Sequence, residues 1–365
     1  MPFDRGSITF SMFDLAGDIP EDFAEKFAAA KAGTLDSVTA EPQFGWVTGR
    51  HLLDTAIDAG SAQSGGSYYL TLRQAVRKIP ASLLNALCRR EEQAFLAANP
   101  GRDYVSGKDK KRIKEDVIAR HISKMPPALS GISMVLEPND KYLYLGAASQ
   151  SQIDLFIENF YRVTKMEPLQ LTPALILERE FHTTCAAFPA LKLNDSPVIP
   201  ADPQVGRDFL TWLLYYSETV GKLNFENNEF DIMLEAPLVL IDENEARGAG
   251  ETTVKKGGSP LRSAEAKAAI NVGKKLKKAK LTITRMNQIW SGTFDADRFV
   301  FTGFKLPEGE EMNEDEIFAE RIQNLEIFRA ALIGYFKAFA AAMLGDEFEK
   351  TQQAVRDWAA SRDGI

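Results

Sequence analysis

The sequence predicts an α+β protein with mixed antiparallel sheets, a helical hairpin and a C-terminal helical region. Three patterns support this prediction. Short strand-like runs bounded by turn residues recur along the chain, two amphipathic helices follow one another within residues 80–126, and the last fifty residues have helical periodicity. The 365 residues are 45% apolar and 26% charged, so the chain can bury a large core.

The first segment combines strands with one helix. Residues 7–13 (SITFSMF) are strand-like, and Pro20 among acidic residues is typical of a helix start, with Gly33 at its end. Residues 44–47 and 68–72 are predicted strands on either side of a loop rich in glycine and serine. This part of the chain is therefore α+β.

Two helices are predicted next. Pro80 suits a first helical position, the segment 99–101 (NPG) stops the helix, and Ser106 with Asp109 matches a capping box for a second helix that ends before Pro126. Their apolar stripes predict a helical hairpin. Beyond it, strands at 132–136 and 142–145 flank a turn, and Ser149 is expected to cap another amphipathic helix.

In the second half of the chain, periodicity assigns the secondary structure less clearly. Residues 208–217 and 230–241 fit either strands or buried helices, and residues 242–260 are polar and glycine-rich, as in a loop. We expect a helix over 264–278 and strands over 281–286 and 299–306. Two closing helices are predicted over 314–344 and 348–360.

The segment 255–285 is the most pronounced charge feature, with ten Lys or Arg residues against the single acid Glu265. On a helix, Lys267, Lys274 and Lys278 share one face. A solvated face normally mixes acids with bases, so this purity of sign favours a phosphate-binding surface over a merely soluble one. The candidate DNA contacts here are Lys255, Lys256, Lys267, Lys274, Lys275, Lys277, Lys278 and Lys280.

A second basic run lies on the helical hairpin, where acids dilute it. Its candidate DNA contacts are Lys108, Lys110, Lys111, Arg112 and Lys114. Two basic elements in a chain of net charge −8 indicate a divided DNA-binding surface, with ordinary solvated helix faces as the alternative. No base-reading motif accompanies them, so we expect contact with the duplex backbone and weak sequence preference.

Other function classes are less favoured. The two cysteines, Cys88 and Cys185, form no redox or zinc motif, and no catalytic, cofactor or metal motif occurs, so we expect a non-enzymatic protein without cofactors. No secretory signal and no run of about 20 apolar residues is expected, which predicts a cytoplasmic protein without membrane contact. Two alternatives stay open: a metal-dependent nuclease using the acidic segments 242–245 and 308–311, and an interaction scaffold without DNA affinity.

The order of these elements resembles the bacterial recombination-associated RdgC family. The resemblance is carried by short collinear segments at 44–47 (FGWV), 79–80 (IP), 114–118 (KEDVI), 134–145, 166–169 (MEPL), 253–256 (TVKK) and 273–282. It implies an RdgC-like ring-forming subunit with a projecting arm. It also implies three units in four segments: a central α+β domain in two parts (1–79 and 127–172), the arm (80–126) and a C-terminal α+β domain with a basic helix and closing helices (173–365).

The resemblance also implies a function. Such proteins pair into a homodimeric ring whose basic inner surface surrounds duplex DNA without sequence preference, and they limit RecA-mediated recombination. Single-stranded DNA stays open as a second ligand, and so does direct contact with RecA. A nucleoid-associated protein in the cytoplasm is expected. Transferred residue by residue, the resemblance makes Lys255, Lys256, Lys274 and Lys277 the first DNA contacts and the arm lysines the second.

Overall fold

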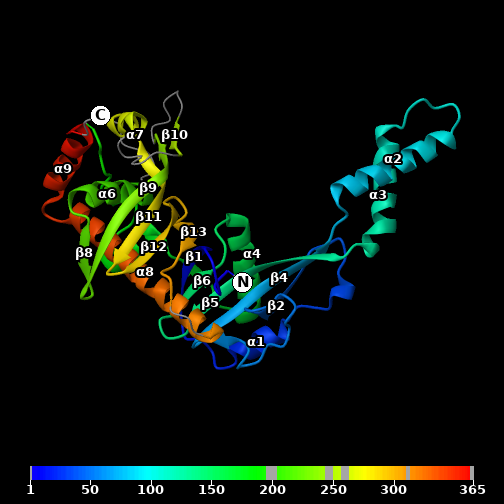
Figure 1. The fold of residues 1–365 in the computed structure, drawn as a ribbon, viewed down its shortest axis with the longest axis horizontal. Helices are drawn as coiled ribbons and strands as arrows, with labels where there is room; N and C mark the ends of the chain where they lie inside the picture. Colours follow the sequence, from blue (N-terminus) through cyan, green and yellow to red (C-terminus); the bar gives the residue numbers. More distant parts are fainter. Residues whose placement is uncertain (1, 195–203, 243–249, 256–262, 310–312, 362–365) are drawn as a thin grey trace.

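The protein is described by a computed structural model over residues 2–194, 204–242, 250–255, 263–309 and 313–361. Within these residues, 13 strands form one sheet in which every ladder is antiparallel, and its main path has the order β10-β9-β11-β12-β13-β1-β6-β5-β4-β2. The predicted α+β class, the helical arm and the C-terminal helical region are confirmed (Figure 1). Ring formation and the division into three units stay predictions.

The element bounds follow chain order. The strands are β1 (Ile8–Leu15), β2 (Gln43–Thr48), β3 (Gln63–Ser64), β4 (Ser67–Arg77), β5 (Pro127–Glu137), β6 (Tyr142–Leu145), β7 (Pro168–Gln170), β8 (Lys222–Phe225), β9 (Asn228–Ile241), β10 (Glu251–Val254), β11 (Lys275–Arg285), β12 (Gln288–Asp295) and β13 (Val300–Lys305). The helices are α1 (Phe23–Ala29), α2 (Ala81–Ala97), α3 (Gly107–His121), α4 (Gln150–Thr164), α5 (Pro173–Phe181), α6 (Val205–Thr219), α7 (Ala264–Asn271), α8 (Glu314–Leu344) and α9 (Phe348–Ser361), with short 3-10 turns at Leu35–Ser37 and Ile122–Lys124.

Each face of the sheet carries its own core. Successive side chains of a strand point to opposite faces, and β1 shows this directly: Phe10 and Met12 enter one cluster, whereas Phe13 and Leu15 enter the other. The first cluster lies beneath α6 and α8 and extends across β9 and β11–β13. The second cluster lies beneath α1 and α4. The two layers of helices therefore cover different parts of the sheet from opposite sides.

The arm leaves the body at the end of the long β4–β5 ladder, whose register runs from Tyr68↔Leu136 to Arg77↔Pro127. Figure 1 shows α2 and α3 standing well away from the rest of the molecule. Arg77 anchors the base of the arm, because its guanidinium donates to the carbonyls of Val38 (2.8 Å) and Met125. The arm is thus a continuation of two paired strands and has a defined root.

The helix α8 is the main core helix of the C-terminal region. Asn313 and Glu316 form a reciprocal capping box at its start, with N–O distances of 3.0 and 3.2 Å. By length and composition α8 could cross a bilayer, so the expectation that no segment is apolar enough is wrong. In this structure 56% of its most apolar window is buried against other elements, as in a core helix.

The structure decides two assignments that were left open in the second half and corrects others. Residues 208–217 belong to a helix, α6, and residues 230–241 to a strand, β9. The predicted helix over 264–278 is wrong beyond Asn271, because Gly273 adopts φ +93° and Lys275 begins a strand. The strand β12 was not predicted at all. Ser149 does occupy the N-cap of α4, but its side chain makes no capping hydrogen bond.

Candidate nucleic-acid interface

The arm has a small hydrophobic core of its own. Val105, Ile113 and Val117 are buried in it, and partly buried side chains of α2 close over them. The N-cap hydroxyl of Ser106 accepts from the amide of Asp109 at 3.2 Å, as the capping sequence predicts. Because α3 uses this one stripe for packing, its remaining faces are directed to solvent.

The basic residues of α3 occupy those solvent faces. All five predicted contacts on this helix are exposed: Lys108, Lys110, Lys111, Arg112 and Lys114. Two of them have partners on the same helix, Lys111 with Glu115 at 4.0 Å and Arg112 with Asp109 at 3.6 Å. Within the described part of the chain, Lys108, Lys110 and Lys114 make no ion pair. Three ammonium groups are therefore available to an external anion.

The arm also differs in net charge from the rest of the chain. Residues 80–126 contain ten Lys or Arg and six Asp or Glu, whereas the whole chain contains 43 and 51. The arm therefore has a formal charge of +4 and the remaining residues −12. A cationic projection on an anionic body is the charge distribution that orients a polyanion toward the projection.

The other predicted DNA-contact surface, residues 255–285, does not form the helical face that was expected. The helix α7 ends in a left-handed glycine, Gly273, and the amide of Lys274 returns to the carbonyl of Ala269 at 2.9 Å, a helix-ending arrangement typical of glycine. Beyond it, Ala279, Leu281 and Ile283 alternate into the core with period two, which is the signature of a strand. The lysine row is therefore on β11, and the proposed single helical face does not exist.

Most β11 lysines are paired with carboxylates from other elements. Lys275 is only 5% exposed and pairs with Asp208 in the core, so the prediction that it contacts DNA is wrong. The other three pairs join Lys277 to Asp297 (3.4 Å), Lys278 to Asp295 (3.0 Å) and Lys280 to Glu235 (2.7 Å). A hydrogen bond from Lys280 holds the pKa of Glu235 below its usual value, so this carboxylate stays charged.

The remaining predicted contacts are dispersed. Lys255 is exposed after β10, Lys267 is half-buried on α7, and Lys274 donates to the hydroxyl of Thr252 at 3.0 Å. Lys256 lies outside the described residues. The structure thus gathers the arm cations on one element and the β11 lysines into ion pairs, and it does not join the two groups into one continuous row.

Two arginines that the sequence reading missed belong to the same region as β11. Arg207 binds Asp297 through two hydrogen bonds of 2.6 and 2.8 Å, and Arg298 binds Asp295 at 2.9 Å. Neither residue lies in a basic run. Their proximity to the β11 lysines depends on sheet register and helix packing, so no local sequence signal could have identified them.

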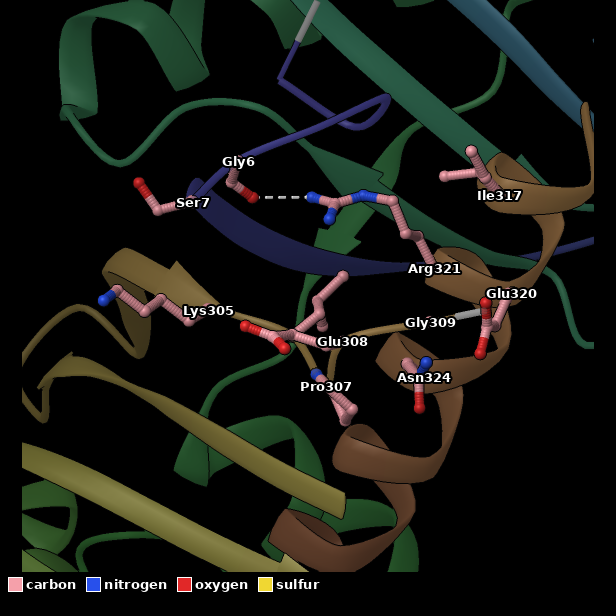
Figure 2. Close-up of a pocket in the computed structure, with 11 residues that line it drawn as sticks. Gly6, Ser7, Lys305, Pro307, Glu308, Gly309, Ile317, Glu320, Arg321 and Asn324 are labelled. Atoms are coloured by element: carbon pink, nitrogen blue, oxygen red, sulfur yellow. Dashed lines mark hydrogen bonds between the residues drawn. The ribbon is translucent and has the colours of Figure 1, made fainter. Parts of the chain in front are cut away.

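A cavity of about 390 Å³ lies where the start of β1, the loop after β13 and the first turns of α8 meet. Figure 2 shows Arg321 reaching across it to the carbonyl of Gly6, at 2.8 Å, while Glu308 and Glu320 face the same space. The positive and negative side chains that line this cavity balance one another, and the guanidinium of Arg321 already donates to a backbone carbonyl. Among the described residues there is no group of three His, Cys, Asp or Glu residues that could hold a metal ion. The nuclease alternative placed its acids at 242–245 and 308–311, most of which lie outside the described residues.

Comparison with known proteins identifies the first half of the chain. No curated protein matches the chain. Residues 11–180 match the family model described as "RdgC: Putative exonuclease, RdgC". The matched range runs from β1 through the entire arm to α5, and it includes the arm cations but ends before β11. The match confirms the resemblance to the RdgC family over residues 11–180.

Proposed function

We propose that this protein is a non-enzymatic, non-sequence-specific duplex-DNA-binding protein whose first contact surface is the arm. The observation that carries the proposal is the surface ammonium groups of Lys108, Lys110 and Lys114, unpaired among the described residues, on an element of net positive charge. Each lysine that neutralises a phosphate releases a condensed counterion, which favours binding without any contact to bases.

The negative charge of the residues outside the arm also supports the arm as the first contact surface. With a formal charge of −12 outside the arm, most of the surface repels a nucleic acid, so attraction concentrates where cations are exposed. The predicted order of the two basic surfaces is therefore reversed. The arm lysines become the first candidates, and the β11 lysines, whose charges are partly neutralised within the protein, become the second.

We further propose that two copies form a ring around the duplex, and that by occupying DNA in the cytoplasmic nucleoid the protein limits RecA-mediated recombination. The support is the match of residues 11–180 to the family model together with the collinear resemblance of the second half. A ring with a basic interior and an acidic exterior would also reconcile DNA binding with a net charge of −8. Mass measurement with and without duplex tests the homodimer.

The arm assignment is tested by titrating a fluorescent nonspecific duplex across a salt series. The triple variant Lys108→Ala, Lys110→Ala, Lys114→Ala is expected to bind more weakly. Its plot of log affinity against log salt is expected to be shallower by up to about 2.7, or about 0.9 for each phosphate that the variant no longer neutralises. The control is Lys222→Ala with Lys350→Ala, at the opposite end of the molecule (Figure 1). A triple variant with wild-type affinity and slope overturns the assignment.

The family description also names exonuclease activity, which makes a nuclease the second candidate function. Incubation of pure protein with end-labelled linear duplex and Mg²⁺ separates the two: nucleotide release that EDTA abolishes would replace the non-enzymatic proposal. A gel-shift assay with nonspecific duplex at low salt addresses the third candidate, a scaffold without DNA affinity, because a scaffold would leave the duplex unshifted.

A further inference from the structure

Arg77, the last residue of β4, bonds to both sides of the root of the arm. Its backbone amide donates to the carbonyl of Thr39 at 2.8 Å, which fixes Arg77 to the body. Its guanidinium donates to four backbone carbonyls, those of Leu35 (3.2 Å) and Val38 (2.8 Å) in the body and those of Ser123 (3.5 Å) and Met125 at the exit of the arm. We name Arg77 and these four carbonyls the root clamp.

Two carbonyls of the root clamp belong to helix ends. Val38 is the C-cap of the 3-10 turn Leu35–Ser37, and Met125 is the C-cap of the 3-10 turn Ile122–Lys124. Carbonyls at the end of a helix have no partner within the helix and carry a partial negative charge. A guanidinium presents five donors in a fixed fork, so one arginine can bond to carbonyls of two segments at once. In the described part of the chain Arg77 has no carboxylate partner, so its charge serves these backbone contacts.

The other interactions of the arm are mostly internal. The β4–β5 ladder ends at the pair Arg77↔Pro127, and Pro127 has no amide hydrogen with which to continue it. The small hydrophobic core of the arm is separate from both clusters of the sheet. Among the described residues, the ion pairs of the arm stay within it, and Arg120 with Glu91 at 3.2 Å joins its two helices. The arm is therefore braced as a unit, and its angle to the body is decided at the root.

The length of the arm amplifies any rotation at its root. The helix α3 has 15 residues and ends at the root, so Lys108 at its start lies about 22 Å from its end. A rotation of roughly 10° at the root moves Lys108 by about 4 Å. This shift is larger than the length of a direct contact between an ammonium group and a phosphate oxygen, about 3 Å. The root clamp therefore controls where the arm cations lie relative to the body.

We propose that Arg77 is a positioning residue that sets the angle of the arm, and thereby the direction in which Lys108, Lys110 and Lys114 are presented to a duplex. This inference rests on the proposed function. With the arm held in one orientation, binding does not have to remove the rotational freedom of a loose arm, so a fixed root favours affinity. Arg77 itself contacts no phosphate and acts through the lysines of α3.

The angle of the arm is measured without DNA, by electron spin resonance between two spin labels in the full chain. The labels are attached at Tyr104→Cys, in the exposed loop at the far end of the arm (Figure 1), and at Ser151→Cys, exposed at the start of α4, with Cys88→Ala and Cys185→Ala removing the native thiols. Excess unlabelled protein restricts the measurement to distances within one chain. Arg77→Gln is expected to widen the distance distribution by on the order of 4 Å. Arg77→Lys, which has three donors and no fork, is expected to give an intermediate width.

Duplex affinity provides a second readout. Both variants keep every arm cation, so the slope of log affinity against log salt is expected to equal that of wild type. Affinity at fixed salt is expected to fall about two- to tenfold for Arg77→Gln, because binding must then also immobilise the arm. The matched control is Arg162→Gln, an arginine of α4 that donates to Asn159 of the same helix at 2.8 Å, and it should change neither the distance distribution nor the affinity.

The outcomes separate this inference from the proposal on which it rests. A distance distribution for Arg77→Gln as narrow as that of wild type shows that the root clamp does not set the angle, and the inference is overturned. A wider distribution with unchanged affinity overturns the positioning role in DNA binding. Failure of wild-type protein to bind duplex at low salt defeats the proposed function, while the distance measurement still decides whether Arg77 holds the arm. If thermal unfolding shows that Arg77→Gln does not fold, both measurements are made on Arg77→Lys.

Discussion

The contact between α8 and the β5–β6 hairpin holds two carboxyl groups together, and this makes the stability of the protein depend on pH. Glu326 of α8 is hydrogen-bonded to Glu137 at the end of β5. Burial, followed by the charge and hydrogen bond of Glu137, raises the pKa of Glu326 to about 7. The other groups facing this contact are the hydroxyl of Ser67, which donates to Glu137, the carboxylate of Asp140, and the guanidinium of Arg329, which binds Asp140 at 3.1 Å and lies 3.4 Å from the ring centre of Tyr142.

The sign of the effect follows from proton binding. The pKa of Glu326 is about 7 in the folded protein against the ordinary value of 4.5, so between these values the folded state binds more protons than the unfolded state. The contribution of Glu326 to the free energy of unfolding therefore has its full value below pH 4.5 and is lost as the pH rises toward 7. Full conversion of the shift corresponds to about 3.4 kcal/mol. Because Glu326 is only half-buried, solvent screening reduces the expected effect to about 1–2 kcal/mol.

The variant Glu326→Gln removes this titration while keeping the side-chain shape. Urea unfolding of both proteins between about pH 4.5 and 8 is expected to show the variant gaining about 1–2 kcal/mol relative to wild type across that range. The control is Glu158→Gln, which removes one carboxylate at the surface of α4. A constant difference between Glu326→Gln and wild type at every pH would refute the shared-proton interpretation.

Two further predictions concern the core and the arm. Asp208→Ala removes the buried carboxylate that pairs with the ammonium of Lys275 and is expected to cost about 3–5 kcal/mol in urea unfolding, so a loss under about 1 kcal/mol would contradict a stabilising buried pair. Ile113→Ala opens a cavity in the small arm core and is expected to destabilise the arm by about 2–5 kcal/mol, which hydrogen exchange should report as faster exchange in α3 with β4 unchanged. Equal acceleration in both elements would mean that the arm does not open independently.

Local patterns predicted the arm and the closing helices correctly. The hydroxyl of Ser106 caps α3, and the predicted range 314–344 is the observed range of α8. These features depend on short-range rules, since capping hydrogen bonds and helical stripes involve residues three or four positions apart. The surface position of Lys108, Lys110 and Lys114 follows for the same reason, because the apolar stripe of a single helix decides which faces are free.

The β11 region shows where local reading fails. A run of lysines, alanines and leucines has good helix propensity, yet the segment after Gly273 is paired on both sides by β9 and β12. The signals for a strand were present in Gly273 and in the period-two alternation of Ala279, Leu281 and Ile283. The helix prediction continued the face of Lys267 and Lys274 past Gly273 and overlooked these strand signals.

The sequence by itself determined the α+β class, the capped helical arm with its cationic face, and the family resemblance of residues 11–180, because each depends on neighbours along the chain. Only the tertiary structure decided which lysines are available to a phosphate. Asp208, Glu235, Asp295 and Asp297 reach the β11 lysines through sheet register and helix packing. Register joins residues that are distant in sequence, and whether an ammonium group is exposed or already paired is a property of that three-dimensional arrangement.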